Sequence, residues 1–221
     1  MAAIAFRGVT FDRGGRRLLE GADWTLEPGE IALATGATGA GKSALLDLCA
    51  LETTPEAGEI EVLGARRADA ALRRRIGRAA QGPELMPHMS AAENVALPLR
   101  LAGLAPAART AQAEELLAWL GLPPARAGAR PGALSAGERR LTALARAAAG
   151  GGDLILLDEP TGDLDDDGTE KVAEMLVALA AHGAAVVAAT GHDAFARRLL
   201  RRPEARPLRL EAGRLVGRGA A

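Results

Sequence analysis

Continuous apolar runs, separated by glycine-rich and charged segments, set the pattern of this chain. Residues 31–34, 154–157 and 184–189 contain only apolar side chains. Runs of this kind are typical of strands buried on both faces, as in a parallel sheet with helices on both sides. Residues 3–26 differ, because short apolar runs alternate there with Gly- and Arg-rich turns, which predicts an antiparallel β meander. Residues 58–64 predict one further strand.

The middle of the chain has a different pattern. Residues 83–150 are rich in Ala, Leu and Arg with interspersed Gly and Pro, which predicts several short helices. Ser90 precedes Glu93 by three positions, and Ser135 precedes Glu138 in the same way. This spacing matches the capping box, in which the two side chains satisfy backbone N–H groups at a helix start. We therefore expect helices to begin at these two serines.

A glycine-rich stretch links the first apolar run to a segment of helical composition. It consists of Gly36-Ala37-Thr38-Gly39-Ala40-Gly41-Lys42-Ser43 and fits G-x-x-x-x-G-K-[ST] at every fixed position. In this pattern backbone N–H groups face phosphate oxygens, the lysine reaches the terminal phosphates, and the hydroxyl can ligate Mg²⁺. The alternative is a glycine-rich turn before an ordinary helix, but the flanking strand and helix favour a phosphate loop. Among 27 basic residues only Lys42 and Lys171 are Lys, so an Arg-preferring chain keeps a compact ammonium here.

These elements together predict an α/β fold with a P-loop NTPase core in a single domain over residues 1–221. We expect a mostly parallel sheet with helices on both faces, formed by residues 1–82 and 151–221. An antiparallel β subdomain is expected at the N-terminus. The remaining residues, 83–150, are expected to form an inserted helical subdomain.

Polar side chains stand where the predicted strands end. Asp158 and Glu159 end one buried strand, His192 follows another, and Gln81 ends a shorter extended stretch. Ligands bind at this edge of open α/β sheets, so we expect these side chains to meet there. Asp158 is expected to hold Mg²⁺, and Glu159 to orient and deprotonate a water that attacks the γ-phosphate. His192 is a candidate sensor of the γ-phosphate, and the Gln81 side-chain carbonyl can ligate Mg²⁺ or the water.

Two residues keep alternatives open at this stage. Phe11 precedes the phosphate loop and could stack on an adenine face, or it could pack in the core. Ser135, with the free N–H groups of its helix, could form an anion site. Its other role is a simple helix cap, which the local pattern favours when taken alone.

Composition narrows the classes of function. The chain has 221 residues, 27 basic and 28 acidic, with a net charge of −1, so its charge makes no case for direct binding of nucleic acid. Cys49 is the single cysteine, which rules out a disulfide within one chain. No apolar run approaches the length of about 18 residues that spans a membrane, and no signal peptide pattern opens the chain. We expect a cytoplasmic protein whose membrane role comes through a partner.

The order of these motifs resembles the ATP-binding subunit of ABC transporters over nearly the whole chain. The resemblance implies that Phe11 is the adenine-stacking residue, Gln81 the Q-loop, His192 the switch histidine and Asp165 the D-loop. The resemblance also implies that residues 134–138 are the signature segment. Members of this family form ATP-dependent head-to-tail dimers, so Ser135 and Gly137 of that segment would touch the nucleotide of the other chain. The expected ATP contacts are Phe11, Gly36, Ala37, Thr38, Gly39, Ala40, Gly41, Lys42, Ser43, Ala44, Ser135, Gly137, Glu138 and Asp165. The expected Mg²⁺ ligands are Ser43, Gln81 and Asp158.

Within that family, residues 158–165 resemble a group that comprises the cell-division ATPase FtsE, the lipoprotein-release ATPase and the macrolide-export ATPase. The chain length and residues 93–103 are most similar to FtsE. This similarity implies an integral membrane partner of the FtsX permease type at the inner face of the cell membrane, and coupling of ATP turnover to septal peptidoglycan hydrolysis. Lipoprotein release and macrolide export are the alternatives within the family. A slowly hydrolysing scaffold that dimerises on ATP is a further alternative.

The chain departs from the family pattern at several positions. Ala44 follows the phosphate loop where a second hydroxyl is usual, and residues 139–141, Arg-Arg-Leu, replace Gln-Gln-Arg. Ala136 replaces the first signature glycine. We expect Ala136 to crowd the phosphate and to disfavour a positive φ, so that Ala136→Gly would raise ATPase activity by easing closure of the dimer.

Overall fold

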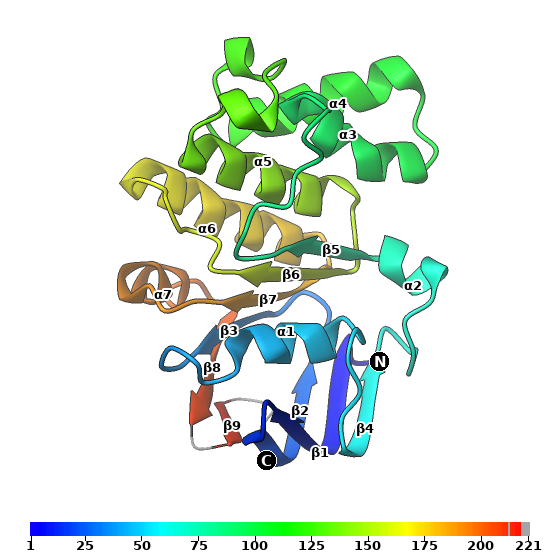
Figure 1. Ribbon diagram of the computed structural model, residues 1–221, viewed down its shortest axis with the longest axis vertical. Helices are drawn as coiled ribbons and strands as arrows, with labels where there is room; N and C mark the ends of the chain where they lie inside the picture. Colours follow the sequence, from blue (N-terminus) through cyan, green and yellow to red (C-terminus); the bar gives the residue numbers. More distant parts are fainter. Residues whose placement is uncertain (212, 218–221) are drawn as a thin grey trace.

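The computed structural model describes residues 1–211 and 213–217, and Figure 1 shows their elements stacked along the longest axis. A three-stranded sheet has the order β2-β1-β4, and a six-stranded sheet has the order β5-β6-β7-β3-β8-β9. The strands are β1 (Ile4–Arg13), β2 (Arg16–Leu26), β3 (Ile31–Thr35), β4 (Ala57–Val62), β5 (Ile76–Ala79), β6 (Leu154–Asp158), β7 (Ala185–Ala189), β8 (Ala205–Glu211) and β9 (Arg214–Gly217). The helices are α1 (Lys42–Cys49), α2 (Ala70–Arg74), α3 (Ala91–Leu101), α4 (Pro106–Trp119), α5 (Ala136–Ala149), α6 (Asp166–Ala181) and α7 (Asp193–Leu199), with short 3₁₀ turns η1 (Pro124–Arg126) and η2 (Pro131–Ala133).

The smaller sheet is antiparallel, as the N-terminal pattern predicts. Strand β1 pairs with β2 on one side and with β4 on the other. The β1–β2 turn contains Gly14 and Gly15, at φ 60° and 75°, a backbone region that favours glycine. A Cβ at Gly58 in β4 would lie 2.3 Å from the carbonyl oxygen of Gly8, so the close approach of the two strands requires glycine there.

The larger sheet carries the buried runs. Strands β5, β6, β7, β3 and β8 are parallel, and β9 pairs antiparallel with β8. Every residue of β6 and β7 is buried. Side chains alternate between the two faces of this sheet: Ile155 and Leu157 join one core cluster, whereas Leu154 and Leu156 join another. The prediction of a mostly parallel sheet with helices on both faces is therefore confirmed.

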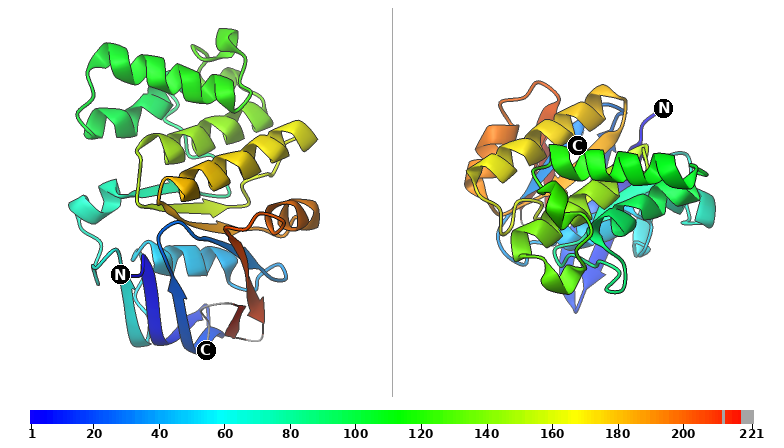
Figure 2. Two further views of the ribbon diagram at one scale, coloured as in Figure 1. Left: turned by 180° about the vertical axis from the view of Figure 1, so that it is seen from behind. Right: turned by 90° about the horizontal axis from the view of Figure 1, so that it is seen from above.

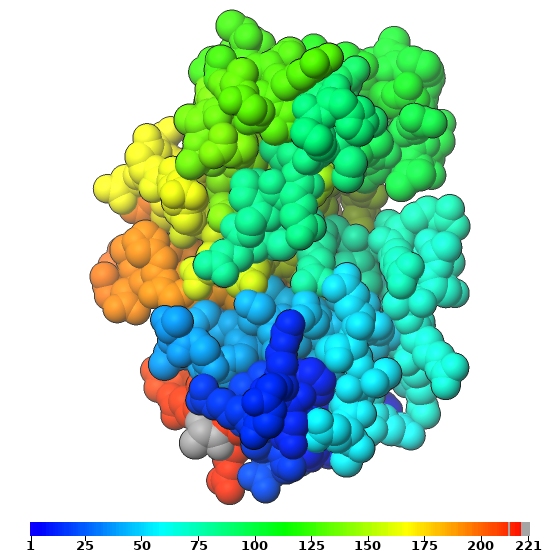
Figure 3. All heavy atoms as spheres, in the orientation of Figure 1, coloured from blue at the N-terminus to red at the C-terminus, as the bar shows by residue number. Residues whose placement is uncertain are grey.

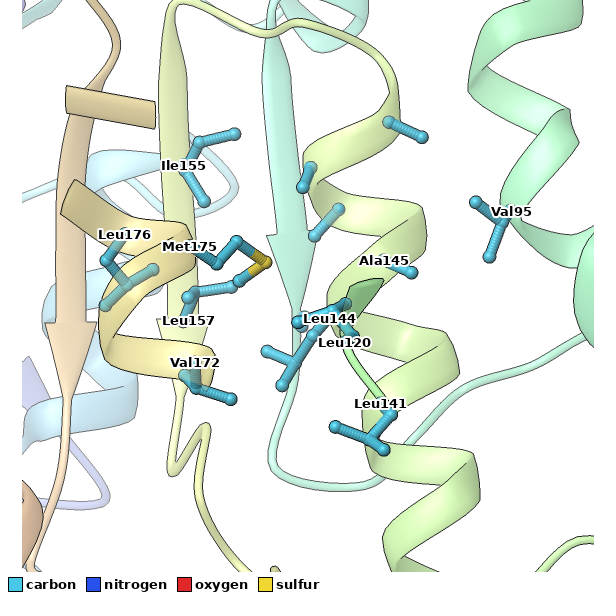
Figure 4. Close-up of a cluster of buried hydrophobic side chains, with 14 of the residues drawn as sticks. Val95, Leu120, Leu141, Leu144, Ala145, Ile155, Leu157, Val172, Met175 and Leu176 are labelled. Carbon is cyan, nitrogen blue, oxygen red and sulfur yellow. The ribbon is translucent and has the colours of Figure 1, made fainter. Parts of the chain in front are cut away.

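The two clusters bind different layers to the sheet. Helix α1 and the antiparallel sheet cover one face, where Leu45 and Leu48 of α1 share a cluster with Trp24 of β2. Helices α5, α6 and α7 lie on the opposite face, as Figures 1 and 2 show from several sides. Figure 4 shows Met175 of α6 directed toward Leu144 of α5 in this apolar interior.

The helices α3, α4 and α5 occupy the segment between β5 and β6. Both predicted capping boxes are present: at α3, for example, Ser90 Oγ accepts from the Glu93 N–H at 3.1 Å and Glu93 Oε2 accepts from the Ser90 N–H at 2.7 Å. Helix α5 lies between α3 and strand β6, so it joins the inserted helices to the sheet. Among the described residues, no helix is both long and apolar enough to cross a bilayer.

Candidate active site

The phosphate loop runs from β3 into α1, as the sequence pattern predicts. Gly39 and Gly41 have φ of 78° and 103°, which a residue with a side chain adopts only at a cost. A Cβ on Gly36 would lie 3.0 Å from the Leu210 carbonyl oxygen, a tight contact that favours glycine at this position. Gly41 is the N-cap of α1 and no side chain caps it, so the first N–H groups of the helix remain available to an anion at the loop.

A cavity of about 410 Å³ opens over this loop and brings Gln81, Asp158 and Glu159 together with the loop, whereas His192 does not line it. Lys42 Nζ donates to the carbonyl oxygens of Gly36 at 2.9 Å and Ala37 at 3.4 Å, which holds the ammonium across the loop. The cavity is lined by Arg13, Arg16, Leu18, Thr38, Gly39, Gly41, Lys42, Ser43, Ala44, Gln81, Asp158 and Glu159. The cavity wall therefore combines cationic groups and free helix N–H groups with two carboxylates.

Glu159 has an unusual backbone for a residue with a long side chain. Its φ is 47°, in the left-handed region, directly after β6 ends. Its N–H donates to the Ala189 carbonyl at 2.8 Å, which fixes the turn against β7. Its carboxylate accepts from Thr190 Oγ1 at 3.0 Å and from the Gly191 N–H at 2.8 Å. Strained backbone of this kind costs about 1 to 3 kcal/mol and gathers at functional sites, so the position of this carboxylate is specified by the fold.

Thr190 links Glu159 to His192 and was not among the residues singled out from the sequence. It is fully buried, and its Oγ1 both donates to Glu159 and accepts from the His192 N–H at 2.9 Å. The His192 ring lies near Thr161, with Nδ1 3.4 Å from Thr161 Oγ1. His192 is also the N-cap residue of α7. A hydroxyl at the end of a strand otherwise made of Ala and Val was the sequence signal for this link.

The signature segment lies at a second cavity of about 580 Å³. Ser135, Gly137, Glu138 and Asp165 line it, whereas the phosphate loop does not. Ser135 caps α5: its Oγ accepts from the Glu138 N–H at 3.1 Å, and Glu138 Oε2 accepts from the Ser135 N–H at 2.7 Å. Arg126 Nε donates to Glu138 at 2.8 Å, and that bond, with the Ser135 N–H, lowers the pKa of Glu138 to about 2. The helix-cap role is therefore present, and one chain keeps the two cavities apart.

A comparison with known families decides what this site belongs to. Residues 19–162 match the model of the family described as "ABC transporter". The chain belongs to the ABC transporter family. It is an ATPase of that family, and the matched range contains the phosphate loop, Gln81, the segment from Ser135 and the Asp158–Glu159 pair.

Named relatives of this ABC transporter chain fall into two groups. The lipoprotein-releasing system ATP-binding protein LolD 1 of Rhodospirillum rubrum is 41% identical over 90% of this chain and 92% of its own length. LolD of Maricaulis maris is also 41% identical, over 87% of each chain. The macrolide export ATP-binding/permease protein MacB of Burkholderia thailandensis is 40% identical over 90% of this chain, which spans only 31% of that relative.

Solved ABC structures agree with the fold. A dimeric post-hydrolysis state of the ATP-binding cassette MJ0796, bound to ADP and Pi, superposes with a TM-score of 0.85 at 29% identity and covers 96% of both chains. Another dimeric structure of MJ0796, described as a bacterial ABC transporter cassette, has a TM-score of 0.84 at 30% identity. These matches confirm the predicted fold class.

The cavity offers a donor set that fits Mg²⁺. Ser43 brings a hydroxyl, Gln81 an amide carbonyl and Asp158 a carboxylate, and all three line the cavity over the phosphate loop. Hard oxygen donors of this kind are the ligands that Mg²⁺ prefers, together with substrate phosphates and water. When bound, the ion neutralises phosphate charge during phosphoryl transfer. Ser43, Gln81 and Asp158 would therefore hold it.

The structure corrects the position of Phe11. Its side chain is 6% exposed and packs in the core cluster with Leu19 and Trp24, so the core-packing alternative describes it. It does not line the cavity over the phosphate loop. Arg13 and Leu18 of the same hairpin line the cavity instead, with Arg16 at its turn. The ring implied as an adenine stacker is therefore a buried core side chain and does not line this cavity.

The structure also corrects the expectation for Ala136. It is the first residue of α5 and is not among the residues with positive φ, because the capping box places the helix start directly after Ser135. Glycine would therefore relieve no backbone strain at this position. The next residue does require glycine: a Cβ on Gly137 would lie 2.8 Å from the Asp163 carbonyl oxygen.

Proposed function

We propose that this chain is the ATP-hydrolysing subunit of an ABC complex of the lipoprotein-release type. The observation that carries the proposal is one cavity that joins Lys42 and Ser43 of the phosphate loop to Asp158 and Glu159 at the end of β6. Such an arrangement suits a triphosphate, with cationic groups for the phosphates and a carboxylate for the attacking water. The 41% identity to two LolD proteins supports the choice within the family.

The geometry supports distinct roles in hydrolysis. Lys42 binds the terminal phosphates, where its ammonium offsets their charge. Glu159 accepts a proton from the attacking water, and the oxygen of that water forms a bond to the γ-phosphorus. The bond between the γ-phosphorus and the oxygen of the ADP leaving group breaks. Thr190 and the Gly191 N–H hold the Glu159 carboxylate, which limits its rotamers. His192, which donates its N–H to Thr190 Oγ1, would report the γ-phosphate to the same carboxylate.

Two chains would complete the site. The cavity at the phosphate loop lacks the signature residues, and Ser135 and Gly137 line a separate cavity with Asp165. A head-to-tail dimer places the second cavity of one chain over the nucleotide of its partner. The relative MJ0796, which was solved as a dimer with ADP and Pi, supports this arrangement.

A membrane permease is the proposed partner, and a recess beside β5 suits its cytoplasmic face. The recess, about 500 Å³, lies between α2, β5, α3 and α5 and forms a hollow between α2 and the helices of residues 83–150 (Figure 3). Arg73, Arg74 and Arg146 stand around an apolar wall that includes Leu97 and Leu101, and Leu101 is 66% exposed. An amphipathic segment with acidic side chains would match this surface. The chain would then act in the cytoplasm at the inner face of the membrane.

The relatives bear unequally on the cargo. The alignments cover nearly the whole of each LolD protein but less than a third of MacB. The LolD proteins are therefore the better guide to the function of this chain. Macrolide export remains the second candidate, at 40% identity. The cell-division assignment gains no support from the relatives compared above.

A test uses the chain together with the membrane protein that co-purifies with it. In proteoliposomes, an acylated lipoprotein should raise ATPase activity and a macrolide should not. Stimulation by the macrolide alone would favour the export assignment. If neither cargo stimulates a complex that hydrolyses ATP, lipoprotein release is wrong, and the absence of any ATP hydrolysis dependent on Glu159 would refute the ATPase assignment itself.

A further inference from the structure

A buried arginine connects the signature helix to the Gln81 segment. Arg140 lies on α5, and its side chain is only 4% exposed, which is rare for arginine. Its Nη1 donates to the Ala80 carbonyl at 3.0 Å, and its Nη2 donates to the Gln81 carbonyl. One guanidinium therefore donates hydrogen bonds to two consecutive backbone carbonyls directly after β5. A planar fork suits this task, whereas an ammonium would hold the carbonyls less specifically.

The surroundings of Arg140 explain why a charge is tolerated there. Burial lowers the pKa of its guanidinium, and three carboxylates oppose that effect, those of Asp163, Asp158 and Glu159. Its Nε has no hydrogen-bond partner among the residues that the structure describes. Burying a charged group that lacks one of its hydrogen bonds costs free energy. The contacts of Arg140 with the two carbonyls must offset this cost, which an arginine on the surface would not incur.

The residue after Arg140 has a different environment. This chain has Arg140 followed by Leu141 on α5. Leu141 is buried in the apolar cluster between α5 and the sheet (Figure 4). One step along an α-helix rotates a side chain by about 100°, which separates the directions of positions 140 and 141. The charge at 140 reaches the end of β5 while 141 fills the core.

We propose that Arg140 is a positioning residue that holds the main chain at Gln81, and thereby places the Gln81 side chain at the nucleotide cavity. The proposal rests on the proposed ATPase function of that cavity. Arg140 does not line the cavity itself, whereas Gln81 does, so its effect on hydrolysis passes through the Gln81 segment. Because Arg140 lies one turn after Ser135 on α5, it also ties the signature segment to the Gln81 segment.

Kinetics of Arg140→Gln test this role. The variant should bind ATP as the parent does but lose about 10- to 100-fold in kcat, because a misplaced catalytic group costs that much. Arg140→Lys should fall between the two. Arg139→Gln is the matched control, since Arg139 Nη1 donates to Leu134 and Pro131 within its own region and does not reach β5; its kcat should stay within about twofold of the parent.

A double-mutant cycle separates positioning from a general structural role. In a Gln81→Ala background the side chain to be positioned is gone, so Arg140→Gln should slow kcat by no more than about twofold further. An equal loss in both backgrounds would overturn the proposal, and so would an Arg140→Gln kcat equal to that of the parent. Should Arg140→Gln fail to fold, the same cycle is run with Arg140→Lys, with the same criteria.

Hydrogen exchange keeps this test independent of catalysis. Amides of residues 80–82 should exchange several-fold faster in Arg140→Gln than in the parent, while those in the middle of β6 stay unchanged. Unchanged exchange at residues 80–82 would contradict the proposal even if hydrolysis is lost. If exchange at residues 80–82 is faster in Arg140→Gln but the parent chain does not hydrolyse ATP, the contact between Arg140 and the Gln81 segment is supported. The proposed ATPase function is then refuted.

Discussion

Replacing Phe11 separates a core residue from a nucleotide contact. The ring is 6% exposed and lies in the cluster beneath the β1–β2 hairpin, with Leu19 and Trp24. Phe→Ala changes at buried sites cost about 3 to 5 kcal/mol, from lost transfer free energy and the cavity left behind. In a chain of this size that loss lowers the melting temperature by about 6 to 20 °C. Phe11→Ala should therefore destabilise the fold strongly.

ATP binding gives the second half of this prediction. Because Phe11 does not line the cavity, the folded fraction of Phe11→Ala should bind ATP within about threefold of the parent, a difference below 1 kcal/mol. Arg13→Ala is the matched variant, two residues along the same strand. Its side chain is 59% exposed and pairs with Asp47 at 2.9 Å, and an exposed ion pair of this kind is worth at most about 1 kcal/mol. Its loss should weaken ATP binding about 2- to 30-fold if the guanidinium lies against the base.

The assay combines thermal unfolding with titration of a fluorescent ATP analogue at a temperature where both variants are folded. The structure predicts opposite outcomes: a large stability loss with normal affinity for Phe11→Ala, and normal stability with weaker binding for Arg13→Ala. A Phe11→Ala chain that melts with the parent but binds ATP more than tenfold more weakly would refute the core placement.

Three further predictions concern the signature segment. Gly137→Ala should lower both the melting temperature and ATPase activity, because its methyl group would meet the Asp163 carbonyl oxygen at 2.8 Å; unchanged values in both assays would contradict this close approach. Ala136→Gly should lower the free energy of unfolding by up to about 1 kcal/mol in urea denaturation, since the position is helical, whereas a stabilised variant would indicate a positive φ. The pKa of Glu138 is lowered to about 2, so its bond with Arg126 should stabilise the fold above pH 4.5 and be lost as the pH falls through 2. The stability difference between the parent and Glu138→Gln should therefore shrink from pH 7 to pH 2, and a difference that does not change with pH would contradict it.

The buried strands and the capping boxes were predictable because their signals are local. Residues 154–157 and 184–189 are apolar without interruption, and the structure buries β6 and β7 completely. The spacing of Ser135 and Glu138 fixes the start of α5 through hydrogen bonds between side chain and backbone in one turn. The phosphate loop is equally local, since its glycines allow the backbone path.

Other features depend on contacts between distant segments. The pairing of β1 with β2 shifts register between Phe6 and Val9, between Val9 and Phe11, and again directly after Phe11. Each shift changes which face of the strand a residue takes, so alternation along the chain could not place this ring. In the sequence Arg140 stood out only as part of a departure from the family pattern, because its partners lie at the end of β5, 59 residues earlier in the chain.

The choice of cargo was the least predictable part. Residues 93–103 suggested a cell-division role by resemblance, yet they lie in α3 and the turn after it, which pack against α5 and the other inserted helices. Side chains that serve packing carry little information on cargo, which a membrane partner would select. The LolD relatives therefore bear on this question more directly than that stretch does.

The most direct test of the account is hydrolysis by Glu159→Gln. Its side chain keeps the shape and the hydrogen bond from Thr190 but loses the proton acceptor, so kcat should fall about 10²- to 10⁴-fold. ATP binding should persist, and gel filtration with ATP and Mg²⁺ should give a stable dimer that the parent forms only transiently. A Glu159→Gln chain that hydrolyses ATP within about tenfold of the parent would contradict the assignment of this carboxylate as the group that activates water.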